Sequence, residues 1–409
     1  MKLLLPILLL ISAHTLESQM KTPDDYTALY ERHKVNSIIS RRFNQNQMFG
    51  WIQPLAQKGV FTARTVGTSA EGRGILLYTL GNGPTKILLW SQMHGDEPTA
   101  TMALIDLLNF FSNEPNHPVS RAIRRNLTLL MVPMINPDGA ERFQRRTAQF
   151  VDMNRDAMRL ATPEARLLKA LRDQYEPEFG FNLHDQDPRY TVGQSKNVAA
   201  IALLAPAMDE EKSDNIGRLK AKQVSAGITE ALNKFIPGRV TRYDDTFEPR
   251  AFGDNVQKWG TSTILIESGG WPGDPEKMHL RKANFIALLS AMTSIANKEY
   301  AKADVSLYET LPFNGKNMYD IILRGATFQA SPSVPPLRVD IGINLEDERD
   351  STGQVSPIAK IVDLGDLSTM AAFQDVDCSE MVFDSTDIEL QKSMPRQAVD
   401  DLLNRKRRQ

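Results

Sequence analysis

A histidine and a glutamate stand three residues apart in the segment 91–98, at His94 and Glu97. The apolar run 86–90 before them is typical of a buried strand, and the stretch 100–108 after them has a helical pattern. An imidazole and a carboxylate at the end of a strand can bind one zinc ion, and a third ligand from far along the chain would leave the fourth position for water. That is the arrangement of a hydrolytic metal site. Glu97 alone has a second interpretation, because a carboxylate in the first turn of a helix interacts favourably with the helix dipole.

Other residues capable of chemistry follow later strands and turns. The segment 136–139, Asn-Pro-Asp-Gly, is a turn signal directly after the strand-like run 127–135. A histidine, His184, ends the apolar run 179–183, and a glutamate, Glu267, ends the run 262–266. Polar side chains also gather between the turn and these strands, at Arg142, Arg145, Asp152, Asn154 and Arg155. The candidate groups therefore fall at strand ends, where open α/β sheets place their sites.

The elements that must position these residues alternate along the chain. Continuous apolar runs predict strands at 75–80, 86–90, 127–135, 179–183, 198–204 and 262–266. Helical patterns lie at 22–58, 99–112, 163–175, 211–235 and 276–298. Apolar strands that alternate with helices indicate a sheet buried on both faces, which is an α/β domain.

The motifs, taken in order, resemble the zinc carboxypeptidase family of metallopeptidases (peptidase M14, carboxypeptidase A-like), in particular its bacterial members. The resemblance covers about residues 60–295. It rests on the segment 66–73, His94-x-x-Glu97, the 136–139 turn, Arg142-x-x-Arg145, Asp152-x-Asn154-Arg155, His184 and Glu267. It implies a mixed central sheet flanked by helices and one zinc ion per chain.

The resemblance also implies a role for each matching residue. His94, Glu97 and His184 would be the zinc ligands. Glu267 would be the general base for a zinc-activated water, and Arg145 would polarise the substrate carbonyl. Asn154 and Arg155 would bind the terminal carboxylate of the substrate, for which the planar guanidinium is well suited.

Four residues keep open roles. Arg142 either assists substrate binding or forms a surface salt bridge, and Asp185 either orients His184 or faces solvent. The tyrosine that closes over the substrate in digestive members has its nearest counterpart in Tyr243, although Phe247 or no residue could stand there. Asp96, within the zinc motif, is similar to bacterial members that include murein-peptide amidases.

The chain changes character after about residue 300. Prolines mark turns, and short strand-like runs at 320–324, 337–343 and 358–363 predict a small β-rich domain at 304–390. Segments of this region resemble the small β-sandwich that flanks amidohydrolase barrels, without the metal-binding histidines of that family. We expect either a substrate-shaping role or a packing role. The remaining residues, 391–409, form a polar basic tail that we expect to be solvated.

The N-terminus of the chain has the features of a targeting signal. Met1-Lys2 followed by the apolar run 3–11 predicts a signal peptide at 1–18, because the run is too short for a membrane span. We therefore expect an exported, periplasmic or secreted protein with its catalytic domain at 20–300. Cys378 is the single cysteine, which excludes an intrachain disulfide. The formal charge of −2 gives no sign of a nucleic-acid partner, and we expect no stable membrane insertion after cleavage of the leader.

These features predict an exported zinc carboxypeptidase that hydrolyses a peptide or peptide-like amide next to a free carboxylate. Its partner would be a peptide or a peptidoglycan peptide. Two alternatives from the same chemistry are a murein-peptide amidase and an N-acyl amino acid deacylase; the 136–139 turn and the chain length argue against the deacylase. A third alternative, of another class, is a pseudoenzyme that binds peptides without cleaving them.

Overall fold

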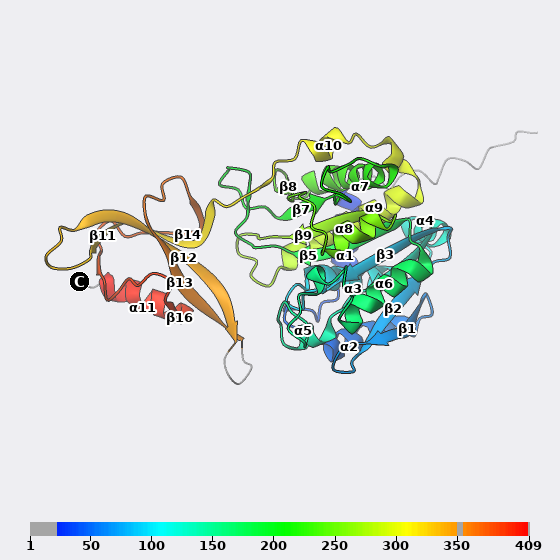
Figure 1. The fold of residues 1–409 in the computed structure, drawn as a ribbon, viewed down its shortest axis with the longest axis horizontal. Helices are drawn as coiled ribbons and strands as arrows, with labels where there is room; N and C mark the ends of the chain where they lie inside the picture. Colours follow the sequence, from blue (N-terminus) through cyan, green and yellow to red (C-terminus); the bar gives the residue numbers. More distant parts are fainter. Residues whose placement is uncertain (1–22, 350–354, 408–409) are drawn as a thin grey trace, which may run out of the picture.

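The computed structural model describes residues 23–349 and 355–407. The leader expected at 1–18 lies outside these residues. Two sheets organise the described chain, one in the first 300 residues and a second, separate one near the C-terminus (Figure 1). Within the described residues, no helix combines the length and the apolar character that a bilayer crossing requires.

The central sheet has eight strands, two more than the sequence predicted, and its mixed direction is as expected. The inner strands β4, β3, β5 and β9 run parallel, whereas β2 and β7 pair antiparallel with this group. In spatial order the strands are β1 (Phe61–Thr68), β2 (Gly74–Leu80), β4 (Leu127–Val132), β3 (Thr85–Ser91), β5 (Phe179–Asp185), β9 (Ser262–Ser268), β7 (Ile201–Leu204) and β8 (Val240–Arg242). The edge strand β1 escaped the sequence analysis because most of its side chains are exposed, so no apolar run marks it.

Helices cover both faces of this sheet, and the alternation along β3 shows how. Ile87 and Leu89 point into one apolar cluster, whereas Leu88 and Trp90 point into another. The first cluster includes α1 (Pro23–His33), α2 (Gln45–Ala56), α3 (Thr99–Asn113), α7 (Ile216–Asn233) and α9 (Met278–Ala296). The second includes α6 (Pro163–Tyr175) and α8 (Phe252–Lys258). Shorter helices, α4 (Pro118–Asn126), α5 (Pro137–Glu141) and α10 (Ser306–Glu309), complete this unit.

The C-terminal region forms a single six-stranded sheet, where the sequence resemblance suggested a sandwich. Its strands are β14 (Ala371–Asp377), β11 (Met318–Gln329), β12 (Leu337–Arg349), β13 (Val355–Gly365) and β16 (Ser393–Pro395), and β15 (Val382–Asp384) pairs with β11. The short pair β6 (Thr191–Val192) and β10 (Asn314–Gly315) joins this region to the loop after β5. The solvated tail expected after residue 391 instead contains α11 (Arg396–Lys406). Its basic residues concealed an apolar stripe, Val399, Leu402 and Leu403, that packs into the core of the second sheet.

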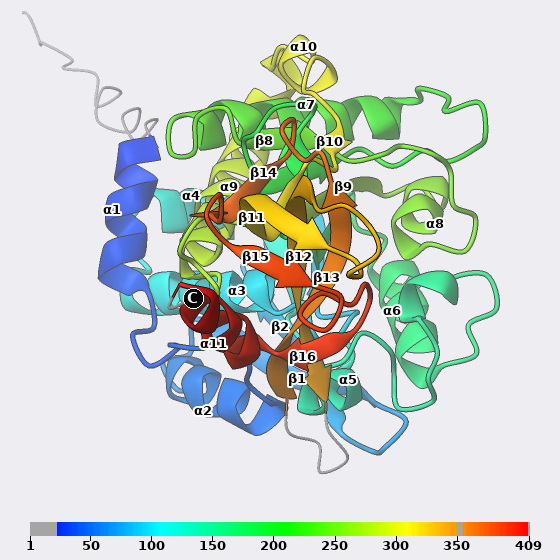
Figure 2. The ribbon, with the colours of Figure 1, turned by 90° about the vertical axis from the view of Figure 1, so that its left-hand side faces the viewer.

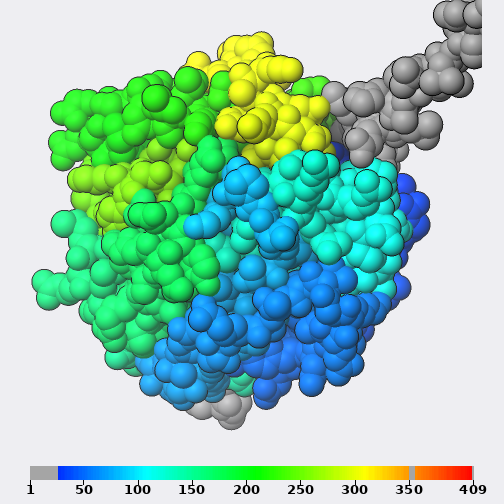
Figure 3. Space-filling view, turned by 90° about the vertical axis from the view of Figure 1, so that its right-hand side faces the viewer, coloured from blue at the N-terminus to red at the C-terminus, as the bar shows by residue number. Residues whose placement is uncertain are grey.

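The arrangement of the two sheets decides where the site opens. The parallel strands β3, β5 and β9 end at one edge of the central sheet, and the C-terminal sheet stands beyond that edge (Figure 1). A view from that side places the C-terminal sheet in front of the central unit (Figure 2). The opposite face shows the blue-to-yellow segments of the central unit and none of the orange or red C-terminal residues (Figure 3).

Candidate metal centre and active site

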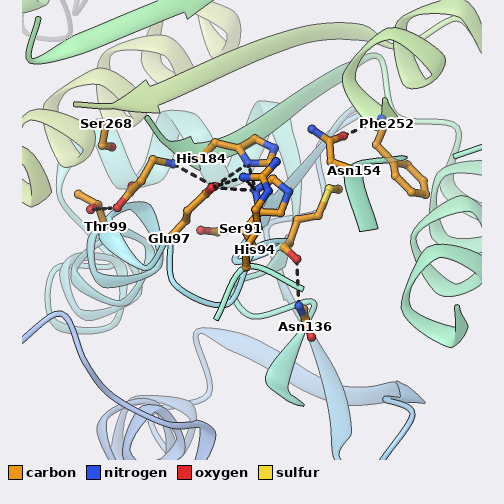
Figure 4. Close-up of polar contacts among 12 residues, drawn as sticks. Ser91, His94, Glu97, Thr99, Asn136, Asn154, His184, Phe252 and Ser268 are labelled. Atoms are coloured by element: carbon orange, nitrogen blue, oxygen red, sulfur yellow. Dashed lines mark hydrogen bonds and ion pairs between the residues drawn. The ribbon is translucent and has the colours of Figure 1, made fainter. Parts of the chain in front are cut away.

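Three buried side chains converge at the ends of β3 and β5. Nδ1 of His94 lies 2.8 Å from Oε1 of Glu97, and Nδ1 of His184 lies 2.8 Å from Oε2 of the same carboxylate. The two Nδ1 atoms are 3.2 Å apart. One ligand atom from each residue lies within 4.8 Å of the others. Figure 4 shows the Glu97 carboxylate beside the two neighbouring imidazoles, with dashed lines to their nitrogens. His94 and Glu97 come from the loop between β3 and α3, and His184 comes from β5.

Asp152 fixes the orientation of the His94 ring. Its Oδ1 lies 3.0 Å from Nε2 of His94, so the ring donates its Nε2 proton to Asp152 and presents its Nδ1 lone pair to Glu97 and His184. The sequence analysis quoted Asp152 only as part of a motif and gave it no role. Its position before Asn154 and Arg155 was the only signal, because nothing in the local sequence pairs it with a residue 58 positions away.

The charges at this cluster favour a cation. Burial alone would lower the pKa of His94, but the charge of Glu97 and the hydrogen bond to Asp152 outweigh burial and raise it to about 9. Burial would raise the pKa of Glu97, but the two histidines hold it well below its ordinary value. Two negative carboxylates therefore surround a pair of imidazole nitrogens, and a positive charge among them is stabilised.

This donor set fits one zinc ion. Imidazole nitrogen and carboxylate oxygen are typical zinc ligands, and three protein ligands are usual at catalytic zinc. With Nε2 donating to Asp152, Nδ1 of His94 faces a carboxylate oxygen of Glu97 at 2.8 Å, a position that either a proton or a metal ion can occupy. As predicted, His94, Glu97 and His184 form a single site among the described residues that is consistent with one zinc ion.

The turn at 136–139 supports the loop that carries His94. The Nδ2 of Asn136 donates to the carbonyl of Met93 at 3.1 Å, and its Oδ1 accepts from the backbone of Gly139 at 2.9 Å. The loop and the turn pack so closely that a Cβ added at Gly95 would lie 2.0 Å from the backbone of Gly139. The Asn-Pro-Asp-Gly motif is therefore a scaffold for the first two metal ligands.

The same turn interlocks with the segment 66–73. Asp138 is fully buried and accepts hydrogen bonds from Ser69 Oγ at 2.7 Å and from Arg73 Nη1 at 2.7 Å. Glu71 forms ion pairs with Arg73 and Arg142. Arg142 also donates to the carbonyl of Asp138 at 3.1 Å. The structure therefore places Arg142 in a salt bridge, and its part in substrate binding stays a prediction.

Glu267 stands directly beside His184, since the two residues are paired in register between β9 and β5. The side chain is buried, and its Oε2 has no hydrogen-bond partner. Burial, reinforced by the charge of Glu97, raises the pKa of Glu267 well above its ordinary value. A carboxylate with one free oxygen next to the metal ligands is suited to exchange a proton with a water molecule.

Asp185 does not bond to the ring of His184. Its Oδ2 accepts from Thr99 Oγ1 at 2.6 Å and from Lys277 Nζ at 3.1 Å. Thr99 begins α3 and Lys277 precedes α9, so Asp185 ties these two helices to the end of β5. Of the two roles left open for Asp185, the structure shows neither the bond to His184 nor full exposure.

Three polar side chains border the cluster where substrate would enter. Arg145 donates from Nη1 to Glu97 at 3.1 Å and from Nε to Asp152 at 3.1 Å, and its side chain is 44% exposed. Asn154 accepts at Oδ1 from the backbone of Phe252 at 2.8 Å, which leaves its amide nitrogen as a donor (Figure 4). Arg155 is 39% exposed, and its Nε lies 3.4 Å from Glu248.

Tyr243 follows β8 and is half-buried. Burial, together with the charges of Glu267 and Glu97, raises the pKa of its phenol above the ordinary value, which places the phenol within electrostatic reach of the site. Phe247 lies under Lys258, whose Nζ is 5.9 Å from the centre of the ring. Whether either residue closes over a substrate stays a prediction.

Comparison with known proteins agrees with this geometry. Residues 48–186 match the family model described as zinc carboxypeptidase. A probable carboxypeptidase 2 of Arthroderma benhamiae is 30% identical over 141 residues, which are 34% of this chain and 26% of that protein. Carboxypeptidase SOL1 of Arabidopsis thaliana is 30% identical over 99 residues, 22% of this chain and 20% of that protein. The aligned part therefore spans about a quarter of the length of these curated relatives.

Solved structures share the fold. A metallo-carboxypeptidase from Burkholderia cenocepacia has a TM-score of 0.50 at 17% identity and covers 63% of this chain and 70% of its own. Bovine thrombin-activatable fibrinolysis inhibitor, solved with a tick carboxypeptidase inhibitor, has a TM-score of 0.52 at 11% identity and covers 63% of this chain and 98% of its own. At these identities the likeness concerns the fold alone.

Proposed function

We propose that this chain, whose residues 48–186 match the zinc carboxypeptidase family model, is an exported zinc carboxypeptidase that removes residues from the C-terminus of peptides. One observation carries the proposal. His94, Glu97 and His184 converge on one point, and Glu267, the residue paired with His184 across the sheet, holds a buried carboxylate oxygen with no other partner.

The residues around the cluster would divide the chemistry. His94, Glu97 and His184 would hold the zinc ion, which when bound would supply a water of lowered pKa and a Lewis acid for the substrate carbonyl. Glu267 accepts a proton from the attacking water and later donates it to the nitrogen of the leaving amine. Arg145 donates hydrogen bonds to the oxygen that becomes negative in the transition state.

The preference for a free C-terminus would come from Asn154 and Arg155. The amide nitrogen of Asn154 is held as a donor by the bond between Phe252 and its oxygen. The guanidinium of Arg155 is accessible and already lies near the carboxylate of Glu248, so a substrate carboxylate can replace a similar partner. Together these groups recognise a planar anion next to the scissile bond.

Export and substrate class extend the proposal. The basic start and the apolar run 3–11 support a signal peptide, and an exported enzyme would meet peptides or peptidoglycan peptides. The exposed arginines at the opening suit substrates that carry a carboxylate, which both classes do. No observation among the described residues favours a deacylase or a pseudoenzyme over a carboxypeptidase.

Mass spectrometry of a mixed panel tests the proposal. The zinc-loaded protein is incubated with ordinary peptides, peptidoglycan stem peptides and N-acyl amino acids, each with and without a chelator. We expect chelator-sensitive loss of a single C-terminal residue from at least one peptide class. Cleavage of acyl amino acids alone would assign a deacylase, and zinc binding without any product would assign a peptide-binding protein.

A further inference from the structure

The strands β12 and β13 form a long antiparallel arm at the edge where the site opens. The arm consists of Leu337–Arg349 and Val355–Gly365, paired from Asp340 and Gly365 at its base to Arg349 and Val355 near its end. It belongs to the C-terminal sheet, which stands in front of the carboxyl ends of β3, β5 and β9 (Figures 1 and 2). The metal ligands and Glu267 lie at or just after these strand ends, so the arm lies on the substrate side of the molecule.

The far part of the arm is attached to the loop that carries Arg145. Asp347 forms ion pairs with Arg41, at 2.9 Å, and with Arg42. The guanidinium carbons of both arginines lie over the ring of Phe143, 5.2 and 5.3 Å from its centre. Phe143 precedes Arg145 by two residues. The arm is thus joined to the loop that carries Arg145 by two ion pairs and by two cation–π contacts with Phe143.

The near part of the arm is attached to the loop that follows the second histidine ligand. Arg189 donates from Nη1 to Asp320 at 3.2 Å and to the carbonyl of Leu345, in the arm, at 3.3 Å. The backbone N–H of Leu345 donates to the same Asp320 carboxylate at 2.7 Å. Gln186, two residues after His184, also accepts a hydrogen bond at Oε1 from Asn314 Nδ2 at 2.7 Å.

The attachments are polar, and the site between them stays open. The only apolar cluster shared by the two units, among the described residues, is a small one formed by Val198, Met318 and Ala371. The side chains of Arg145 and Arg155 remain 44% and 39% exposed. The arm is therefore joined to the loop that carries Arg145 and to the loop after His184, while Arg145 and Arg155 keep part of their surface exposed.

We propose that this arm sets the size of substrate that reaches the metal centre, and that the enzyme acts on unfolded C-terminal peptide segments and excludes the ends of folded domains. The inference rests on the proposed function and adds a substrate class to it. An extended chain contributes at most about 3.3–3.6 Å per residue, so a folded body must carry a tail long enough to pass the arm before its last residue reaches Glu267. A free peptide has no such requirement.

A series of tethered substrates tests the inference. One small folded domain carries Gly/Ser-rich tails of roughly 2, 5, 10 and 20 residues, all ending in the same cleavable sequence, and the free peptide of that sequence serves as reference. We expect the wild-type protein to cleave the free peptide and the longest tail at similar kcat/KM, and the shortest tail at least tenfold more slowly. Equal kcat/KM for all tails would overturn the inference without any variant.

The second part of the experiment uses a variant in which the arm is released. The double variant Asp347→Arg, Arg189→Ser reverses the charge opposite Arg41 and Arg42 and removes the bond to Leu345. We expect its kcat/KM on the shortest tail to rise at least tenfold while its rate on the free peptide, which also reports correct folding, stays within twofold. Glu348→Arg is the matched control, because the adjacent side chain on a strand points to the other face.

The outcomes separate the two proposals. If the wild-type protein cleaves no free peptide, the proposed function fails and the inference fails with it. If free peptide is cleaved but the variant keeps the tail-length dependence of the wild type, the carboxypeptidase stands and the role of the arm is refuted.

Discussion

Replacement of Asp152 by asparagine should weaken zinc binding although Asp152 is not a metal ligand. The carboxylate accepts from His94 Nε2 at 3.0 Å and from Arg145 at two positions, both at 3.1 Å, and its side chain is only 12% exposed. An amide keeps one acceptor oxygen for the imidazole but turns a donor toward Arg145 and loses the negative charge. Partners of this kind contribute about 10–100-fold to metal affinity, which corresponds to about 1.4–2.8 kcal/mol. The low exposure of Asp152 favours the upper half of that range.

The assay is a competition for zinc between the protein and a chromophoric chelator. Asp185→Asn is the matched control, because Asp185 adjoins His184 in the sequence but binds Thr99 and Lys277 instead of an imidazole. We expect the Kd for zinc to rise 10–100-fold in Asp152→Asn and by a clearly smaller factor in Asp185→Asn. An unchanged Kd in Asp152→Asn, or a larger loss in the control, would refute the role assigned to Asp152.

Four further predictions follow from the same contacts. Glu267→Gln should retain zinc and lose about 10²–10⁴-fold in kcat, measured on the best peptide of the panel with zinc content determined in parallel; a rate like that of the wild type would remove Glu267 as general base. Arg155→Ala should raise KM roughly 10–150-fold for peptides with a free C-terminus, as expected for loss of about 1.5–3 kcal/mol of charged hydrogen bonding; an unchanged preference for free over amidated peptides in steady-state kinetics would contradict this. Arg281→Ala should lower the free energy of unfolding by about 3–5 kcal/mol in urea titrations, because it leaves the buried Asp106 carboxylate unpaired and frees the carbonyls of residues 35 and 38; a loss below 1 kcal/mol would argue against that account. Burial raises the pKa of Asp254 to about 7, so the folded state binds this proton more tightly than the unfolded state does, and stability should fall as pH rises from about 4 to about 7. Asp254→Asn should reduce that fall by at most about 4 kcal/mol in denaturation curves at several pH values, and the same slope in both proteins would contradict the assignment.

The residues at strand ends were predictable because two local signals coincide there. An apolar run marks each of β3, β5 and β9, and a polar residue with metal-binding or acid–base chemistry follows or ends each run. Parallel strands bring such ends to one edge, so His94, His184 and Glu267 had to lie near each other once the sheet was assigned. The parallel core of the sheet and the zinc site were predictable for this reason.

The partners of these residues were harder to predict from the sequence, because they depend on packing between distant segments. Nothing near Asp152 indicates that its carboxylate meets His94, and nothing near Arg142 indicates that Glu71 engages it. The length of the arm also escaped prediction, since the unbroken run of exposed charged residues at 346–349 conceals the continuation of β12. In α11 a basic composition obscured three apolar residues whose helical spacing buries them.

One measurement addresses the central claim most directly. The zinc-loaded wild-type protein is given an equimolar pair of peptides that differ only in a free or an amidated C-terminus, and the products are followed by mass spectrometry. The account predicts release of one C-terminal residue from the free peptide, little or none from the amidated one, and loss of the reaction in His184→Ala. Equal cleavage of both peptides, or undiminished cleavage by His184→Ala, would contradict a carboxypeptidase built on this metal centre.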